Sequence, residues 1–142
     1  MIRTFAEGDL DALLDTWYRA SLIAHPFLTE DFLAQERKNI PELYMPHAET
    51  WVFDLDGDIV GFISLIENEV AAIFVEPDLQ GRGIGRSLMD YVRALRGELE
   101  VDVFEANSIG RRFYDRYGFL PMREYMHEPT GQRVLRLHLP QA

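Results

Sequence analysis

Residues 75–87 of the chain read VEPDLQGRGIGRS, and no other stretch says as much about the fold. The apolar run 70–75 precedes it, and Pro77 ends that run, as is typical of a strand that stops there. Three glycines follow, and glycine permits the backbone angles of a tight turn. Apolar residues then recur at helical spacing, so the stretch predicts a strand, a turn and a helix in succession. The expected inward face of this helix is formed by Leu88, Met89, Val92 and Leu95.

The same turn predicts an anion-binding site. A helix start has unpaired backbone N–H groups and the positive end of the helix dipole, and glycines let a phosphate approach the backbone. Arg82 and Arg86 add positive charge there. Two phosphate motifs do not fit: G-x-G-x-x-G meets Arg86 or Leu88 at its last position, and G-x-x-x-x-G-K-[ST] needs a lysine where Arg86 stands. A diphosphate is the expected ligand, and a loop that only turns the chain is the alternative.

The rest of the chain alternates between helical and strand patterns. Strands are expected at residues 2–5, 50–55, 59–66, 70–75, 99–104, 119–126 and 134–139. Further helices are expected from Asp9, as a cap, to about His25, from Thr29 until Pro41 and Pro46 interrupt the chain, and after Asn107. In the first of these, Leu22 and Ile23 belong to the apolar residues that recur at mostly helical spacing. The order β-α-α-β-β-β-α-β-α-β-β indicates a mixed α+β sheet in one domain, residues 1–142.

Composition excludes several classes of protein. The 142 residues include no cysteine, so a disulfide scaffold, a thiolate zinc site and a cysteine nucleophile are excluded, and the four histidines show no metal-ligand spacing. No apolar run reaches the length of a spanning helix, and acidic residues follow the first strand directly, so we expect a cytoplasmic protein. Residues 1–81 hold 16 acids and 4 bases, and residues 82–142 hold 8 acids and 10 bases. This acidic chain is not expected to bind nucleic acid or a membrane.

Two motifs resemble those of the GNAT superfamily of N-acetyltransferases. The pattern Q-x-x-G-x-G, at Gln80, Gly83 and Gly85, is similar to the family's coenzyme A pyrophosphate loop. Residues 107–119 resemble its second signature, N-x-x-A-x-x-F-Y-x-x-x-G-F, with Gly110 in place of the usual alanine. The resemblance spans the chain and extends to a bacterial subgroup that includes protein-lysine acetyltransferases. It implies a central mixed, mostly antiparallel sheet flanked by about four helices.

The resemblance also implies acetyl-CoA as the cofactor. The cofactor-binding residues would be Ile73, Phe74, Val75, Gln80, Gly81, Arg82, Gly83, Ile84, Gly85, Arg86, Ser87, Asn107 and Tyr114. Asn107 would hydrogen-bond the cofactor, and Tyr114 would face the departing sulfur. The residues themselves leave alternatives open: Asn107 is also a good helix cap, and Tyr114 is also a good core aromatic. Tyr117 is expected to pack.

The implied reaction requires a neutral amine. A lysine-like amine has a pKa of about 10.4, so a base should lie near the thioester. Glu67 and Glu69, which flank a strand turn, are the candidates, and His25 is another because its pKa suits proton transfer. Surface carboxylates in a turn and a loop-anchoring histidine are the alternatives. The acceptor pocket is expected to include His25, Phe27 and Trp51.

We therefore expect an enzyme that transfers acetyl from acetyl-CoA to a primary amine by direct attack. A protein lysine or N-terminus is expected first and a small amine second, and the acidic first half favours a cationic acceptor. The alternative is a non-catalytic acyl-CoA-binding sensor or interaction module, which would not need Tyr114 as a proton donor. A nucleotide-dependent regulator is disfavoured, because the chain does not fit the dinucleotide-binding and P-loop motifs. The sequence leaves the choice between monomer and homodimer open.

Overall fold

A computed structural model describes residues 1–141 of the chain. Within them the strands are β1 (Ile2–Thr4), β2 (Glu49–Leu55), β3 (Asp58–Ile66), β4 (Glu69–Val75), β5 (Leu99–Phe104), β6 (Leu120–His127) and β7 (Gln132–Leu139). The α-helices are α1 (Leu10–Ala24), α2 (Glu30–Asn39), α3 (Ile84–Arg96) and α4 (Ser108–Tyr117). Short 3-10 or π-helical turns cover Glu7–Asp9, Ile40–Tyr44, Met45–His47 and Pro77–Leu79. No helix in this range combines the length and apolar character needed to cross a membrane.

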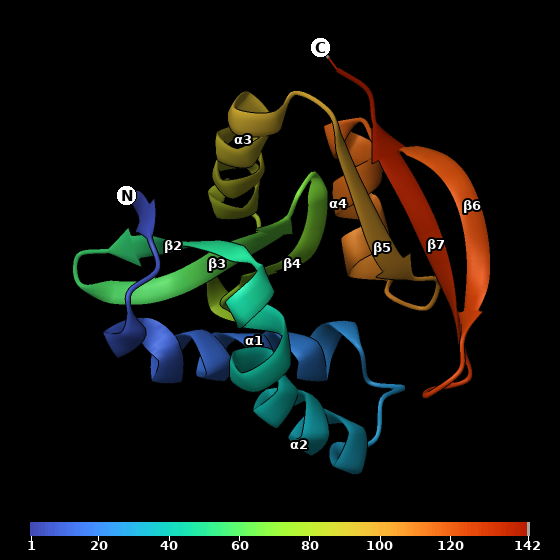
Figure 1. The fold of residues 1–142 in the computed structure, drawn as a ribbon, viewed down its shortest axis with the longest axis horizontal. Helices are drawn as coiled ribbons and strands as arrows, with labels where there is room; N and C mark the ends of the chain where they lie inside the picture. Colours follow the sequence, from blue (N-terminus) through green and yellow to red (C-terminus); the bar gives the residue numbers. More distant parts are fainter. Residues whose placement is uncertain (142) are drawn as a thin grey trace.

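The strands form one sheet in the order β1-β2-β3-β4-β5-β7-β6. Neighbouring strands are antiparallel except β4 and β5, which are parallel. Parallel neighbours need a crossover connection, and α3 supplies it. The predicted order of elements and the mixed, mostly antiparallel sheet with four helices are therefore confirmed. In Figure 1, β2, β3 and β4 lie across the left of the view, whereas β5, β7 and β6 run down the right.

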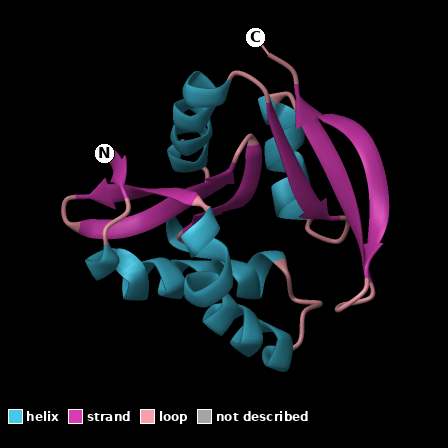
Figure 2. Cartoon of the chain, viewed as in Figure 1, coloured by secondary structure: helices cyan, strands magenta, loops and turns pink. Residues whose placement is uncertain are grey.

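Helices cover both faces of the sheet and build two cores. The core on the α1–α2 face contains Leu13, Leu14, Trp17, Leu33, Val52 and Phe62. The core on the α3–α4 face is larger and includes Ile63, Leu65, Leu88, Met89, Val92, Val101 and Tyr114. Figure 2 shows α3 above β2–β4 and α1 and α2 below them. The first half of the sheet is thus packed between helices on both faces, and this packing positions β4.

The sheet opens between β4 and β5. Only two residue pairs join these strands, Glu69 with Glu100 and Val70 with Val101. Beyond these pairs β4 continues to Val75 and β5 continues to Phe104 without pairing to one another. Backbone N–H and C=O groups on such an edge need another partner, so the parted strands leave a place for a ligand.

Leu95, which we predicted to face inward, lies on the surface, as do Leu22 and Ile23 from the helical apolar pattern of α1. Leu22, Ile23 and Leu95 are 42%, 53% and 50% exposed. In α1 the small residues Ala20 and Ser21 are buried instead. The helical period was correct, but the inward face of the last turn of α1 is formed by these small residues, because that turn borders the opening in the sheet.

The predicted interruption at Pro41 and Pro46 is present, because α2 ends at Asn39 and short turns, π-helical over Ile40–Tyr44 and 3-10 over Met45–His47, replace the α-helix. One local prediction was wrong in detail. Asp9 precedes α1 as predicted, but its carboxylate accepts no hydrogen bond from the α1 backbone. Arg3 is its partner instead.

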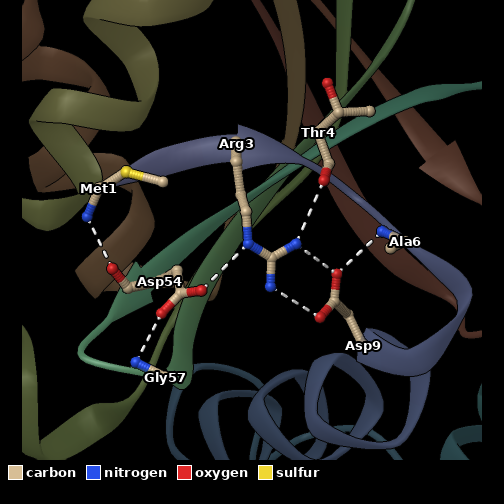
Figure 3. Close-up of polar contacts among 7 residues, drawn as sticks. All are labelled: Met1, Arg3, Thr4, Ala6, Asp9, Asp54 and Gly57. Atoms are coloured by element: carbon tan, nitrogen blue, oxygen red, sulfur yellow. Dashed lines mark hydrogen bonds and ion pairs between the residues drawn. The ribbon is translucent and has the colours of Figure 1, made fainter.

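Arg3 ties the first strand to the start of α1 and to the β2–β3 turn (Figure 3). Its guanidinium donates to both carboxylate oxygens of Asp9, at 2.8 and 2.9 Å, and to Asp54 at 3.0 Å. Asp9 also accepts the Ala6 N–H at 2.8 Å, and Asp54 accepts the Gly57 N–H at 2.8 Å. These contacts hold the pKa of both carboxyls below its usual value, and hydrogen bonds from Arg3 are the main cause.

Replacing Asp9 with Ala is expected to destabilise the fold by about 2 kcal/mol, because it leaves a partly buried guanidinium without its bidentate partner. Urea unfolding at pH 7 measures this change. Asp11→Ala, at an exposed position in the first turn of α1, is the control and should change the free energy of unfolding by less than about 0.5 kcal/mol. If Asp9→Ala and Asp11→Ala change the free energy of unfolding equally, the contacts between Arg3 and Asp9 do not stabilise the fold.

Candidate active site

A groove of about 1070 Å³ follows the parted edges of β4 and β5. Its walls come from α1, α2, β4, β5, β6, the glycine turn and the start of α4. At the end away from the glycine turn, α2 and β6 approach one another, with the Phe32 and His127 rings 6.1 Å apart. The groove therefore joins the predicted anion site to a second chamber between α1, α2 and the second half of the sheet.

One wall of the groove is the free edge of β4. Residues 71–75, including the predicted Ile73, Phe74 and Val75, line it. On the other edge β4 pairs with β3, so alternate backbone groups of this stretch face the groove without a strand partner. An extended ligand with amide groups can hydrogen-bond to such an edge as an added strand would.

The glycine turn leads from β4 into α3 with its backbone exposed to the groove. Gly81 and Gly83 have φ angles of +82° and +87°, a region that favours glycine, and an added Cβ would meet no atom within 4 Å at either position. Gln80 anchors the turn by donating from Nε2 to the Val75 carbonyl at 3.2 Å. The N–H groups of the first turn of α3 have no acceptor within the helix. This open, donor-rich surface fits a diphosphate.

The structure divides the predicted cofactor-binding residues of this turn into two sets. Those that line the groove are Gln80, Gly81, Gly83, Gly85 and Arg86. The others have side chains elsewhere: Arg82 and Ser87 are exposed outside the groove lining, and Ile84 is buried in the core. Any contact that Ile84 makes to a ligand must therefore come from its backbone N–H.

Tyr114 lies on α4 and lines the groove. It is 8% exposed, its ring packs edge-on against Phe113 and Phe119, and its hydroxyl has no hydrogen-bond partner within residues 1–141. Burial raises the pKa of Tyr114, so the hydroxyl stays protonated at neutral pH. Tyr117 differs, because its hydroxyl donates to Asp90 and Arg86 lies over its ring. Tyr114 thus has a proton available for a ligand.

Asn107 connects α4 to the end of α1. Its Oδ1 accepts the Gly110 N–H at 2.9 Å, which makes it the N-cap of α4. Its Nδ2 lies 3.1 Å from Nε2 of His25, the residue that ends α1. Each end of the amide keeps one hydrogen-bonding position for a ligand in the groove. The capping function that we left open for Asn107 is therefore present.

His25 is enclosed by aromatic rings. The rings of Phe27, Phe74 and Phe104 pack edge-on against it, with centroids 5.7, 6.4 and 5.3 Å away. Burial lowers the pKa of His25 from 6.5 to about 4, so the imidazole is neutral at pH 7. His25 lines the groove, and Phe27, in the loop between α1 and α2, contacts the His25 ring.

The two predicted acids lie in different places. Glu69 begins β4, lines the groove and lies 3.3 Å from Nη1 of Arg136. Glu67 is exposed in the β3–β4 turn, outside the groove lining, and its carbonyl accepts from Nε of Arg96 at 2.9 Å. Within residues 1–141 no three histidine or acidic side chains are arranged to hold a metal ion.

Trp51 faces away from the groove. It belongs to the core on the α3–α4 face, where its ring lies 5.8 Å from that of Tyr91. The alternation of strand residues between faces explains this position, since its neighbours Thr50 and Val52 face the α1–α2 side. Among the three predicted acceptor residues, His25 lines the groove, whereas Phe27 lies outside the lining and packs edge-on against His25.

Sequence reasoning missed an acidic cluster in the groove. Asp102 and Tyr125 line it, and the Tyr125 hydroxyl donates to Asp102 Oδ2 at 2.7 Å. Arg136 lies within 3.3 Å of three carboxylates, those of Glu69, Glu100 and Asp102. The alternation of acidic and apolar residues along 99–104 was the available signal, because it places Glu100 and Asp102 together on one face of β5. Glu69 and Asp102 line the groove, whereas Glu100 and Arg136 lie outside its lining, and one cation for three anions leaves this acidic wall negative.

Comparison with known proteins agrees with this geometry. A family model described as an acetyltransferase (GNAT) domain matches residues 46–121, more than half of the chain. The chain belongs to the GNAT family of acetyltransferases. Among curated relatives, the peptidyl-lysine N-acetyltransferase YiaC of Escherichia coli K12 is 33% identical over 120 residues, which are 84% of this chain and 82% of YiaC.

Solved structures of other proteins show the same fold. The solution structure of apo YjaB from Escherichia coli has a TM-score of 0.89 and 26% identity, and the match covers 100% of this chain and 98% of YjaB. The PaiA N-acetyltransferase from Thermoplasma acidophilum, solved in complex with coenzyme A, has a TM-score of 0.78 at 16% identity, covering 100% and 98%. The GNAT fold therefore extends over the described chain, beyond the residues that the family model matches.

Proposed function

We propose that this GNAT acetyltransferase transfers the acetyl group of acetyl-CoA to the side-chain amine of a lysine in a protein or peptide. The observation that carries this proposal is the continuous groove, whose lining includes the glycine turn, Tyr114 and, from the acidic wall, Glu69 and Asp102. A relative of similar length is a peptidyl-lysine N-acetyltransferase, which supports a lysine acceptor.

The glycine turn and the edge of β4 would hold the cofactor. Backbone N–H groups of residues 83–86 and the Arg86 side chain would bind the diphosphate, because they are donors at the start of α3, beside open space at Gly81 and Gly83. The free edge of β4, Ile73 to Val75, would hydrogen-bond the amide-bearing arm. Acetyl-CoA supplies an acetyl group activated as a thioester. The chain's own residues then have to orient an amine, remove its proton and protonate the leaving sulfur.

Tyr114 would supply the proton to the leaving sulfur. Its hydroxyl is protonated at neutral pH and unpaired in the groove. A proton held at Oη by a buried ring is positioned before the reaction begins, so little reorganisation is needed. Tyr117 is unsuited to this function, because its hydroxyl already donates a hydrogen bond to Asp90.

The acidic wall would receive the lysine ammonium and help to remove its proton. Holding the amine neutral at pH 7 costs about 4–5 kcal/mol, since its pKa is about 10.4. We assign the base function to Glu69 rather than to Glu67, because only Glu69 lines the groove. Asp102 and Glu100 add negative charge beside it, which attracts the cationic acceptor. His25 and its surrounding rings would border the aliphatic part of the lysine.

Matched peptides test this proposal. We would incubate the protein with acetyl-CoA and three peptides of equal length: one with a lysine and an acetylated N-terminus, one with arginine in place of lysine, and one with a free N-terminus and no lysine. Mass spectrometry locates the acetyl group, and a thiol assay follows coenzyme A release. We expect acetylation of the lysine peptide alone.

The other outcomes separate the alternatives. Acetylation of the free N-terminus alone would replace the lysine acceptor with an α-amine. Binding of coenzyme A by calorimetry without transfer to a lysine, an α-amine or a polyamine would favour the non-catalytic acyl-CoA sensor. Absence of both binding and transfer would contradict the assignment of the glycine turn.

A further inference from the structure

The link between His25 and Asn107 joins two segments that are 82 residues apart in the sequence. His25 ends α1, and Asn107 begins α4, the helix that carries Tyr114. The rings of Phe27, Phe74 and Phe104 pack edge-on against the imidazole. Within residues 1–141, the link to Asn107 is the side-chain hydrogen bond of His25, and through it His25 can act on the active site.

The hydrogen-bonding pattern defines the state of both side chains. Asn107 Oδ1 accepts the Gly110 N–H, so the amide cannot be turned round without placing its NH₂ group against another donor. Its Nδ2 must then donate to His25 Nε2, which has to be an acceptor. The imidazole is therefore neutral, with its proton on Nδ1.

Gly110 makes room for this arrangement. A Cβ at position 110 would lie 2.6 Å from Asn107 Nδ2 and 3.0 Å from its Cγ, closer than real Cβ atoms approach. The Asn107 amide would have to move, and any such movement weakens its bond to His25. The family signature has alanine at this position, so the glycine in this chain is explained by an asparagine amide that is turned toward His25.

We propose that His25 is a positioning residue that acts through Asn107, and that Gly110 is the residue which permits it to do so. Together the three residues set the start of α4. Tyr114 lies seven residues beyond Asn107, which is two helical turns along the same face. A shift of the first turn of α4 moves the Tyr114 hydroxyl relative to the edge of β4. This inference rests on the proposed acetyl transfer only where it is tested by enzyme kinetics.

Four variants test the proposal: His25→Phe, His25→Gln, Gly110→Ala, and His25→Phe combined with Gly110→Ala. Phe keeps the aromatic packing but has no acceptor, whereas Gln offers a carbonyl oxygen to Asn107 Nδ2. We expect kcat on a lysine peptide to fall about tenfold in His25→Phe and in Gly110→Ala, with KM for the peptide unchanged. His25→Gln should recover kcat to within about threefold of the wild type.

The double variant shows whether the residues act as one unit. If both single changes break the same Asn107 contact, the double variant falls about tenfold and no further, whereas independent effects would multiply to about a hundredfold. Ala is a better helix former than Gly, so a purely structural role for position 110 predicts an equally or more stable α4 and no loss of kcat. Multiplying effects, or a Gln variant no better than Phe, would overturn the proposal.

NMR provides a readout that does not depend on turnover. Long-range ¹H–¹⁵N spectra should show His25 as the neutral tautomer with its proton on Nδ1. The ring signals of Tyr114 should shift in His25→Phe and Gly110→Ala and return toward the wild type in His25→Gln. If the wild type transfers no acetyl group but the variants show these shifts, the result would contradict the proposed function and leave the positioning function intact. A proton on Nε2, or a raised peptide KM at unchanged kcat, would overturn the positioning function and leave His25 with acceptor binding alone.

Discussion

Tyr114→Phe is expected to lower kcat for lysine acetylation about 100-fold, while the dissociation constant of coenzyme A changes less than about threefold. The change removes one hydroxyl from a buried ring and leaves its packing against Phe113 and Phe119 intact. That hydroxyl has no partner within residues 1–141, so its loss leaves no protein group unsatisfied. The folded state should therefore keep its stability, and only the protonation of the leaving sulfur is affected.

Tyr117→Phe is the matched control, because it removes the same atom one helical turn away. Tyr117 also lines the groove, but its hydroxyl already donates to Asp90 on α3, so kcat should stay within about threefold of the wild type. Steady-state kinetics of both variants, with coenzyme A binding by calorimetry, measures the comparison. A Tyr114→Phe enzyme with nearly full kcat would show that solvent or another group protonates the sulfur, and equal losses in both variants would indicate a general disturbance of α4.

Local patterns were sufficient to predict the order of elements. Thr29 accepts from the Phe32 N–H at the start of α2, and Gly97 and Gly118 end α3 and α4 with positive φ angles. These signals depend on a few neighbouring residues, which the sequence shows directly. Leu95 was misplaced, and Leu22 and Ile23 lie on the surface, because the face that a helix buries depends on its distant neighbours.

The candidate site divides in the same way. The glycine turn and Asn107 could be predicted because each acts through its own backbone or through residues three positions away. Alternation along 99–104 groups Glu100 with Asp102, but their meeting with Arg136 and the His25 contact could not be predicted, because these require the register of β5 against β7 and the meeting of segments 82 residues apart. Trp51 was assigned to the acceptor pocket on residue type, and the alternation of β2 turns it to the opposite core.

Acid sensitivity of the fold provides the second large effect. The unfolded chain should bind a proton at His25 near pH 6.5, whereas burial among the rings of Phe27, Phe74 and Phe104 lowers the pKa of His25 in the folded protein to about 4. Between these values the unfolded state holds more protons, so stability rises with pH. The contribution is complete above about pH 6.5 and is lost as pH falls toward 4, and it amounts to about 3 kcal/mol.

Urea unfolding from pH 7.5 to 4 in the wild type and His25→Gln measures this contribution. Gln does not titrate, so the difference in unfolding free energy between the two proteins should change by about 3 kcal/mol over this range. The other three histidines are common to both proteins and cancel in the difference, and the paired carboxyls of Asp9 and Asp54 titrate lower still, because Arg3 lowers their pKa. If the difference in unfolding free energy is independent of pH, the His25 ring takes up a proton as readily in the folded state as in the unfolded state. Asn107 would then have no acceptor on the protonated ring.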